Sequence, residues 1–368
     1  MIKNIKKNFQ KLFKKISYNL FFFLYGEIKG IVKSSNSKNV IIFEKIKNNI
    51  KYNIYHNINS RLYTDTIHDT AIIFDKHILD GPSFQLRNNI NSNCINNSVL
   101  TKGTPRFKKK IKGNVLSLLT GGGGNKNYYH WLFDVLPRLE IALQTINIED
   151  INYFLFPDTQ FKFQYESLDL LKIKKKKRLS SRKYRHIEAD NIICTDHPYS
   201  FGNDIHSDAQ NVPIWILDWL KKTFMGESNT ETRVLKNYKK IYIDREDGNY
   251  NSRLLANNIE IKNLLRSYQY KIINLSNFSF KDQISIFNSA DSVIGLHGAG
   301  FANLVFCRPN TDVVEIKVKS TGDMYKNIAK NNNLKYAHIN GFDKENTSNI
   351  QDGIINIELD ELKKKLLI

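Results

Sequence analysis

Apolar runs of strand length, separated by polar turns, fill residues 40–120 and predict a β-rich region. A helix is expected next, from about Tyr128 to Ile146, because apolar positions recur there at helical spacing, and Pro137 is expected to interrupt it. Residues 215–224 predict a further helix. The strand-length runs of this half are NVIIFE (39–44), TAIIFD (70–75), VLSLL (115–119) and INYFLF (151–156).

After a polar stretch at 226–233, which we interpret as an inter-domain linker, strands and helices alternate. Helices are expected at about 252–267, 280–288 and 323–332. The strand-length runs are KKIYIDR (239–245), YKIINL (270–275), SVIGL (292–296) and TDVVEIKV (311–318). Such alternation is typical of a parallel sheet with helices on both faces. The sequence therefore predicts an α/β protein of two domains, residues 1–225 and 226–368.

The sharpest local feature is the sequence HGAG at 297–300, which follows the apolar strand 293–296 and precedes a short helix beginning near Phe301. A helix N-terminus beyond the carboxyl end of a strand is where α/β sheets bind anionic ligands. Small residues let the backbone approach a phosphate closely, and His297 can donate a hydrogen bond to it. The dinucleotide fingerprint and the P-loop pattern are both absent, so a phosphate-binding loop and a tight structural turn both stay open. Glu315, at the end of the next strand, either takes ribose hydroxyls or is an exposed strand-end acid.

A second feature is the pair His130 and Asp134, which are four residues apart and so share one face of the expected helix. An aspartate behind a histidine fixes its tautomer and raises its basicity, as a general base requires. Arg138 continues the same face and adds a cation. The alternative reading is a capping or core histidine in an ordinary helix pair. The preceding Gly121–Gly124 run is either a mobile acceptor loop or a linker.

Two arginines form a third feature. A strand delivers Arg245 to its end, and Arg253 is expected to open the following helix. Arginine binds a diphosphate through a bidentate fork and keeps its charge at any working pH. Together with the loop at His297, these residues could neutralise a pyrophosphate leaving group without a metal. Surface arginines are common, so a solvated role is the alternative.

Charge narrows the class of partner. The chain holds 55 Lys+Arg against 36 Asp+Glu, a formal net charge of +19, which favours an anionic partner such as nucleic acid, a nucleotide, a glycan or a membrane surface. Heavy use of Lys, Asn and Ile indicates an AT-rich genome, so part of this charge is background. The basic run at 171–186 is read as a solvated face, with docking on anionic lipid or glycan as the alternative. Three cysteines without metal-ligand spacing predict no zinc site and fit a reducing cytoplasm.

The N-terminal region 1–30 combines basic and apolar residues. The run ISYNLFFFLY (16–25) is shorter than the roughly 20 residues that a membrane-spanning helix needs, and no cleavage site follows it. Six lysines precede it, at positions 3, 6, 7, 11, 14 and 15. It is therefore read either as a helix lying on an anionic membrane or as a packed first helix with a solvated basic face.

Three blocks carry a family resemblance that composition alone does not. NYYHWLFDVLPRL (127–139), REDGNYNSRLLAN (245–257) and IGLHGAGFANLVFCRPNTDVVEI (294–316) resemble, in order and separation, the signature blocks of glycosyltransferase family 61. The resemblance implies a GT-B architecture, in which two Rossmann-like domains face a central cleft. It also implies inverting, metal-independent transfer from a nucleotide sugar, so that no cofactor and no metal are expected. Residues 1–225 would then bind the acceptor and residues 226–368 the nucleotide sugar.

The same resemblance assigns site residues by position. It implies that His130 or Asp134 is the catalytic base and that Arg138 contacts the acceptor. Glu315 would bind the ribose, and Asn303 would face the sugar. The full set of donor residues that it implies is Arg245, Arg253, His297, Gly298, Ala299, Gly300, Asn303 and Glu315.

The lack of a membrane anchor and of a cysteine-rich luminal context favours a bacterial-type member that builds capsule, lipopolysaccharide or another surface glycan. The expected partners are a nucleotide-sugar donor, a glycan or lipid-linked glycan acceptor and an anionic membrane surface, with no nucleic acid. The expected location is cytoplasmic, on the inner face of the plasma membrane. Two alternatives stay open: a basic nucleic-acid-binding protein without catalytic activity, against which no recognisable binding module is present, and an inactive family member acting as a scaffold.

Overall fold

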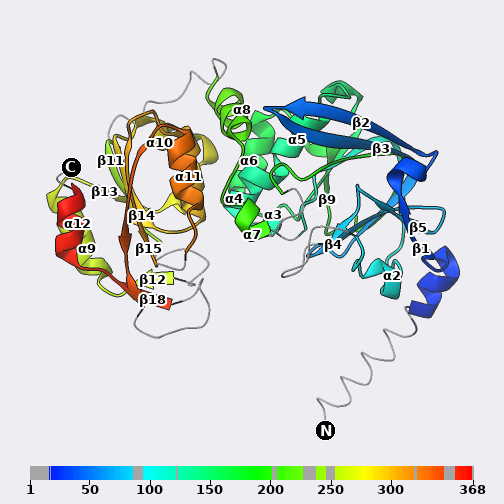
Figure 1. The fold of residues 1–368 in the computed structure, drawn as a ribbon, viewed down its shortest axis with the longest axis horizontal. Coiled ribbons are helices and arrows are strands. Elements are labelled where there is room, and N and C mark those ends of the chain that lie inside the picture. Colours follow the sequence, from blue (N-terminus) through cyan, green and yellow to red (C-terminus); the bar gives the residue numbers. More distant parts are fainter. Residues whose placement is uncertain are drawn as a thin grey trace, which may run out of the picture. The chain divides into compact units, whose positions relative to one another are not determined.

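The computed structural model divides into two compact units (Figure 1). Unit 1 comprises Met1–Gln160 and Ile173–Asp208, and unit 2 comprises Phe161–Lys172 and Ala209–Ile368. Compared with the expected division at residue 225, unit 2 also takes in helix α8 (Ile214–Met225) and the segment 161–172. The structure describes residues 16, 18–85, 94–121, 123–200, 205–226, 238–245, 253–318, 321–343 and 353–366.

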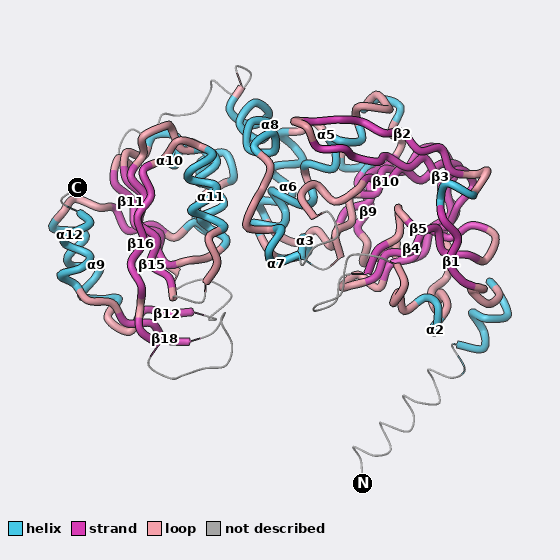
Figure 2. Tube along the Cα trace, in the orientation of Figure 1, coloured by secondary structure: helices cyan, strands magenta, loops and turns pink. Residues whose placement is uncertain are grey.

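Unit 1 is built on one ten-stranded mixed sheet (Figure 2). Its main path runs β1-β5-β4-β3-β10-β7-β8-β9, with β2 beside β3 and β6 beside β4. Strands β10, β7, β8 and β9 pair in parallel, whereas β3 pairs antiparallel with β2, β4 and β10. The strands are β1 (Gly30–Lys33), β2 (Val40–Lys47), β3 (Ile50–Thr64), β4 (Asp69–Phe74), β5 (His77–Asp80), β6 (Phe84–Gln85), β7 (Lys109–Ser117), β8 (Tyr153–Phe156), β9 (Arg178–Ser180) and β10 (His186–Thr195). The four apolar runs expected as strands overlap β2, β4, β7 and β8, which confirms them.

The helical stretch after Gly121 is interrupted where the sequence predicts. Leu136 donates its N–H to the carbonyl of Trp131, five residues back, so the helix widens into a π-helical turn before Pro137. Pro137 then begins a new α-helix, where its missing N–H is tolerated. The helix ends at Ala142, short of the expected 146. The helical elements of unit 1 are residues 18–25, η1 (Ser34–Asn36), α2 (Val99–Lys102), α3 (Gly123–Lys126), α4 (Tyr128–His130), η2 (Trp131–Val135), α5 (Pro137–Ala142), η3 (Ile148–Asp150), η4 (Lys175–Lys177) and α7 (Ile205–Asp208).

Unit 2 contains a five-stranded parallel sheet in the order β13-β11-β14-β15-β16. Helices α9 and α12 cover one face and helices α10 and α11 the other (Figure 1). The strands are β11 (Lys240–Ile243), β13 (Lys271–Ile273), β14 (Ser292–Leu296), β15 (Asp312–Lys317) and β16 (Lys335–Asn340). The helices are α6 (Lys162–Leu170), α8, α9 (Asn258–Ser267), η6 (Leu275–Asn277), α10 (Phe280–Ser289), η7 (Ala299–Phe306), α11 (Met324–Asn331) and α12 (Leu359–Leu366). The α/β prediction is confirmed, and the parallel sheet of unit 2 is the one that the βα alternation predicts.

Arg253 was expected to open a helix, but the structure places it in a strand. It begins strand β12 (Arg253–Leu255), which pairs in parallel with β18 (Gly353–Asn356), and β18 pairs antiparallel with β17 (Phe342–Asp343). Helix α9 starts only at Asn258. The prediction failed because the strand's partner lies about 100 residues further along the chain, a distance over which local periodicity carries no information.

Each unit has its own apolar core. In unit 2, Ile261 and Leu265 of α9 and Leu362 of α12 pack on Ile294 and Ile316 of the sheet, and all five are buried. In unit 1, buried aliphatic side chains of β3, β4, β7, β8 and β10 form one cluster. Among the described residues, no helix combines the length and the apolarity that a membrane crossing requires.

Candidate functional site

The parallel sheet of unit 2 has a topological switch point between β11 and β14. Numbered along the chain, its strand order is 2-1-3-4-5, so the chain runs from the first strand to one edge and then crosses back to the other side. In such sheets the crevice beyond the carboxyl ends of the two central strands binds the ligand. The switch point therefore marks the ends of β11 and β14, where Arg245 and the loop at 297–300 lie.

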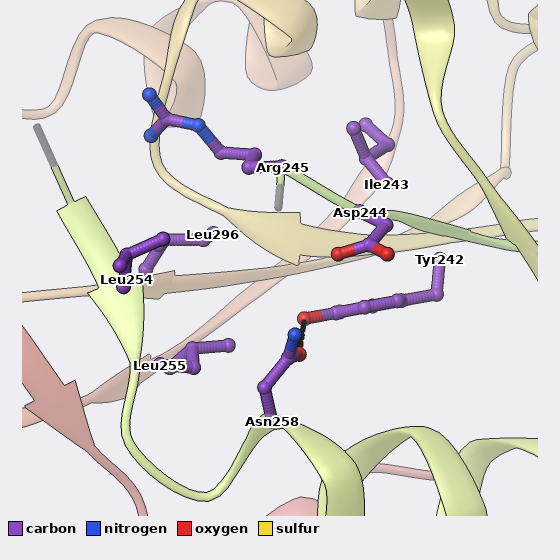
Figure 3. A pocket seen from close by; sticks show the side chains of 8 residues that line it. All are labelled: Tyr242, Ile243, Asp244, Arg245, Leu254, Leu255, Asn258 and Leu296. Carbon is purple, nitrogen blue, oxygen red and sulfur yellow. Dashed lines mark hydrogen bonds between the residues drawn. The ribbon is translucent and has the colours of Figure 1, made fainter. Parts of the chain in front are cut away.

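A small, open pocket lies at this point (Figure 3). Across it, the Tyr242 hydroxyl donates to Oδ1 of Asn258 over 3.0 Å, and Asp244 forms an ion pair of 2.7 Å with Lys262 of α9. The wall is apolar where Leu254 and Leu255 of β12 approach. The residues that line the pocket are Tyr242, Ile243, Asp244, Arg245, Leu254, Leu255, Asn258 and Leu296.

Arg245 supports the loop at residues 297–300, which lies next to this pocket. Its Nη1 donates to the carbonyl oxygen of His297 over 2.7 Å, and the guanidinium lies against Gly298. A Cβ at position 298 would come within 2.7 Å of that nitrogen, so a larger residue there would move the guanidinium from this position. Burial lowers the pKa of Arg245 from its ordinary value, yet arginine remains charged at neutral pH. Arg245 and His297, two of the predicted donor residues, are thus in direct contact.

His297 is oriented by a buried carboxylate. Its Nδ1 is hydrogen-bonded to Oε1 of Glu315, and the hydroxyl of Tyr336 donates to the other oxygen, Oε2. The ring also lies 4.9 Å from that of Tyr325. Glu315 is fully buried, so the reading as an exposed strand-end acid is wrong. Because both carboxylate oxygens are occupied inside unit 2, the geometry gives Glu315 a positioning role rather than the expected contact with ribose.

Asn303 is also buried. Its Nδ2 donates to Oε1 of Gln283 over 3.1 Å and to the carbonyl oxygen of Gly300 over 3.2 Å. The side chain is 0% exposed, so it ties η7 to α10 instead of facing a sugar as expected. A Cβ at Gly300 would come within 2.9 Å of Leu275. The side chain of Leu275 therefore packs against the HGAG loop at Gly300, and a larger residue there would displace it.

In unit 1, His130 and Asp134 meet as the sequence predicts. His130 Nδ1 lies 2.6 Å from Oδ2 of Asp134, the side chain of His130 is 31% exposed and that of Asp134 is 3% exposed. Asn127 caps the start of this helix by accepting the N–H groups of Tyr129 and His130. Burial lowers the pKa of His130, but the charge and the hydrogen bond of Asp134 raise it by more, so the net shift is upward. A histidine so held has its outer nitrogen, Nε2, placed to take a proton.

Two residues that sequence reasoning missed complete the surroundings of Asp134. The hydroxyl of Tyr199 donates to Asp134 Oδ1, and Nε2 of His197 lies 3.9 Å from Oδ2. His197 Nδ1 accepts the backbone N–H groups of Tyr199 and Ser200, which leaves its proton on Nε2. Burial lowers the pKa of His197 to about 3, so this ring is neutral. Their position just beyond the end of β10, at the carboxyl edge of the parallel strands, is the one signal that could have found them.

Arg138 is buried directly behind the pair. Its Nε donates to the carbonyl oxygen of Asp134 over 3.1 Å, and its Nη1 donates to that of Thr195 over 3.0 Å. Burial lowers its pKa to about 10. In this structure the guanidinium ties the π-helical turn to the end of β10, and its expected contact with an acceptor stays a prediction.

The two arrangements suit different chemistry: a histidine–carboxylate pair able to accept a proton in unit 1, and a cation beside a small-residue loop at the switch point in unit 2. Comparison with known families finds both histidines in the region that matches a single family. The family model described as Glycosyltransferase 61 matches residues 128–314, about half of the chain, and the match contains both His130 and His297. No curated protein matches the sequence.

Proposed function

Because this chain belongs to glycosyltransferase family 61 and is therefore a glycosyltransferase, we propose that it transfers a sugar with inversion from a nucleotide-sugar donor to a glycan acceptor, without a metal. The observation that supports this most directly is the contact between His130 and Asp134 inside the matched region. It supplies the base that a direct displacement needs. Because the chain belongs to a family of glycosyltransferases, we do not retain the alternative of a nucleic-acid-binding protein without catalytic activity.

On the donor side, the proposal assigns the switch point of unit 2 to the nucleoside diphosphate. Arg245 offsets the charge of the diphosphate, and the loop Gly298–Gly300 carries no side chain of its own larger than the methyl group of Ala299. His297, whose Nδ1 donates to Glu315, can also donate from Nε2 to a phosphate oxygen as the imidazolium ion, in which both ring nitrogens carry a proton. Arg253 and Ala299 are kept in this donor set. The GT-B arrangement of the two units is part of the same proposal.

In the proposed step, His130 Nε2 takes the proton of the acceptor hydroxyl while that oxygen attacks the anomeric carbon. The new carbon–oxygen bond forms on the face opposite the leaving group, and the bond from the anomeric carbon to the diphosphate oxygen breaks. The electron pair leaves with the nucleoside diphosphate, whose charge Arg245 offsets. Asp134 stabilises the imidazolium that results and keeps the proton of neutral His130 on Nδ1.

The acceptor class comes from the sequence resemblance alone. We propose a surface glycan, capsule or lipopolysaccharide, assembled by a bacterial enzyme in the cytoplasm at the inner face of the plasma membrane, with no cofactor. Arg138 is retained as an acceptor residue only through its link to Asp134.

The test is a panel of UDP-, GDP- and CMP-sugars scored by thermal unfolding and by product formation, with metal chelated. A matching donor is expected to raise the melting temperature, and Arg245→Ala should abolish that rise. Arg308→Ala is the matched control, because Arg308 is half exposed and pairs with Asp291, just before the amino end of β14. His130→Ala should keep the rise but lose transfer. If no sugar nucleotide shifts the wild-type protein, or only metal restores transfer, the proposal is wrong.

A further inference from the structure

The helix of residues 18–25 presents an apolar face to solvent. Phe23 is 87% exposed, and Leu20 and Leu24 are 45% and 44% exposed. Ile16, just before this helix, is 59% exposed. A folded protein seldom leaves adjacent large apolar side chains uncovered unless the surface has a partner.

The orientation of this helix is fixed by its other face. The ring of Phe21 packs edge-on against Phe107 at 5.0 Å, and the ring of Tyr25 packs against His186 at 4.9 Å. The hydroxyl of Tyr25 accepts the backbone N–H of Lys108 over 2.8 Å. The outward direction of Phe23 and Leu24 is thus set by packing on unit 1. Phe107, which packs on this inner face, is itself 68% exposed.

Basic residues lie near this helix in the sequence, and one lies beside it in the structure. Lys29, Lys102 and Arg106 are exposed; Lys29 follows the helix in the sequence, and Lys102 lines a pocket together with Phe21 and Phe22 of the helix. The fifteen residues that precede Ile16 contain six lysines and no acidic residue. Glu27 is the one acidic residue among residues 1–30. An apolar helix face in a lysine-rich part of the sequence complements a bilayer whose surface carries anionic headgroups.

We propose that this surface, made of Leu20, Phe23 and Leu24 on a helix whose sequence neighbours are rich in lysine, docks unit 1 on an anionic lipid bilayer. The helix lies in the plane of the membrane, with Phe23 and Leu24 entering the boundary between headgroups and acyl chains. A short helix with one exposed apolar face offers too little area for a stable dimer of two copies, which favours lipid as the occupant. The proposal does not depend on the donor chemistry of unit 2.

The test is flotation of the full chain with vesicles of phosphatidylcholine alone, or with phosphatidylglycerol as about one lipid in three, because each lysine near an anionic surface adds to the attraction. The wild-type protein should float with the anionic vesicles only, less so at high salt. Phe23→Ser should lower the membrane partition coefficient about tenfold, the loss expected when one phenylalanine no longer enters the apolar layer. Phe342→Ser, at a 61% exposed phenylalanine of unit 2, is the matched control and should bind like the wild type.

Leu24→Ser is a second variant of the same face and should also lower vesicle binding. Unchanged thermal unfolding shows that each variant is folded. Equal flotation with neutral vesicles, or flotation that Phe23→Ser and Leu24→Ser leave unchanged, would overturn the proposal. Self-association that Phe23→Ser abolishes, without any vesicle binding, would assign the surface to a second copy of the chain and overturn it as well. Donor-induced stabilisation should be the same in all these variants, so failure here is separate from failure of the proposed transfer.

Discussion

Two histidine–carboxylate pairs, one in each unit, share the same contact and differ in everything around it. In both, Nδ1 of a histidine meets a carboxylate oxygen: His130 with Asp134, and His297 with Glu315. The first pair lies on one helical turn, and the second joins the end of β14 to the neighbouring strand β15. The same two side-chain types therefore reach the same geometry from a local and from a tertiary arrangement.

The difference lies in what each histidine has left to offer. His130 is 31% exposed beside an aspartate that also holds Tyr199, whereas His297 is 16% exposed, lies beside Tyr325 and gives its carbonyl oxygen to Arg245. A more open imidazole with a raised pKa suits proton transfer. An imidazole fixed beside an arginine suits binding of an anion. The surroundings rather than the pair assign the role.

The largest expected effect separates the pairs at the catalytic step. Asp134→Asn should lower kcat about a thousandfold or more, because the amide can favour the wrong tautomer of His130 and cannot stabilise its cation. Donor affinity, measured by calorimetry, should be unchanged. Asp75→Asn, at an exposed aspartate of the same unit, is the control. An unchanged kcat would remove His130 as the base.

A smaller effect is expected for the other pair. Glu315→Gln should weaken donor binding about tenfold, since His297 loses a charged hydrogen-bond acceptor, and should cost about 1–3 kcal/mol of unfolding free energy. At saturating donor, kcat should stay close to that of the wild type. Calorimetry, urea unfolding and steady-state kinetics separate these terms. A large loss of kcat with unchanged affinity would reverse the roles assigned to the two pairs.

The smallest effect is in the pH dependence. His130 must be neutral to accept a proton, and its pKa is raised above 6.5, so kcat/KM should fall below that raised value by about tenfold per pH unit. The stability that the protonated pair contributes has the opposite sense: it is fully present below 6.5 and is lost as the pH rises through the raised pKa. Profiles of rate and of melting temperature against pH should show both. A rate that holds constant as the pH falls well below 6.5 would contradict a basic His130.

Patterns that span only a few neighbouring residues are enough to predict several elements of this fold. The apolar runs of β4, β8 and β14 and the break at Pro137 follow from periodicity and from the chemistry of proline. The contact of His130 with Asp134 follows from helical spacing. These features need no knowledge of the rest of the chain.

The remainder depends on partners far away in the sequence. Arg253 became a strand because of β18, and Glu315 and Asn303 are buried by Tyr336 and Gln283, which no spacing rule connects to them. Tyr199 reaches Asp134 from 65 residues away. Burial is set by tertiary packing. It decides whether a polar residue can contact a ligand itself or instead positions another residue that does.

The family match and the folded units have different limits, and this matters for anyone who would shorten the gene. Strand β10 lies inside the matched region, but both of its neighbours, β3 and β7, precede residue 128. At the other end, β16 and β18 follow residue 314, and β18 supports the β12 wall of the pocket. A fragment encoding 128–314 alone would leave two sheets with bare edges. The region that the family model matches is therefore not an autonomous folding unit.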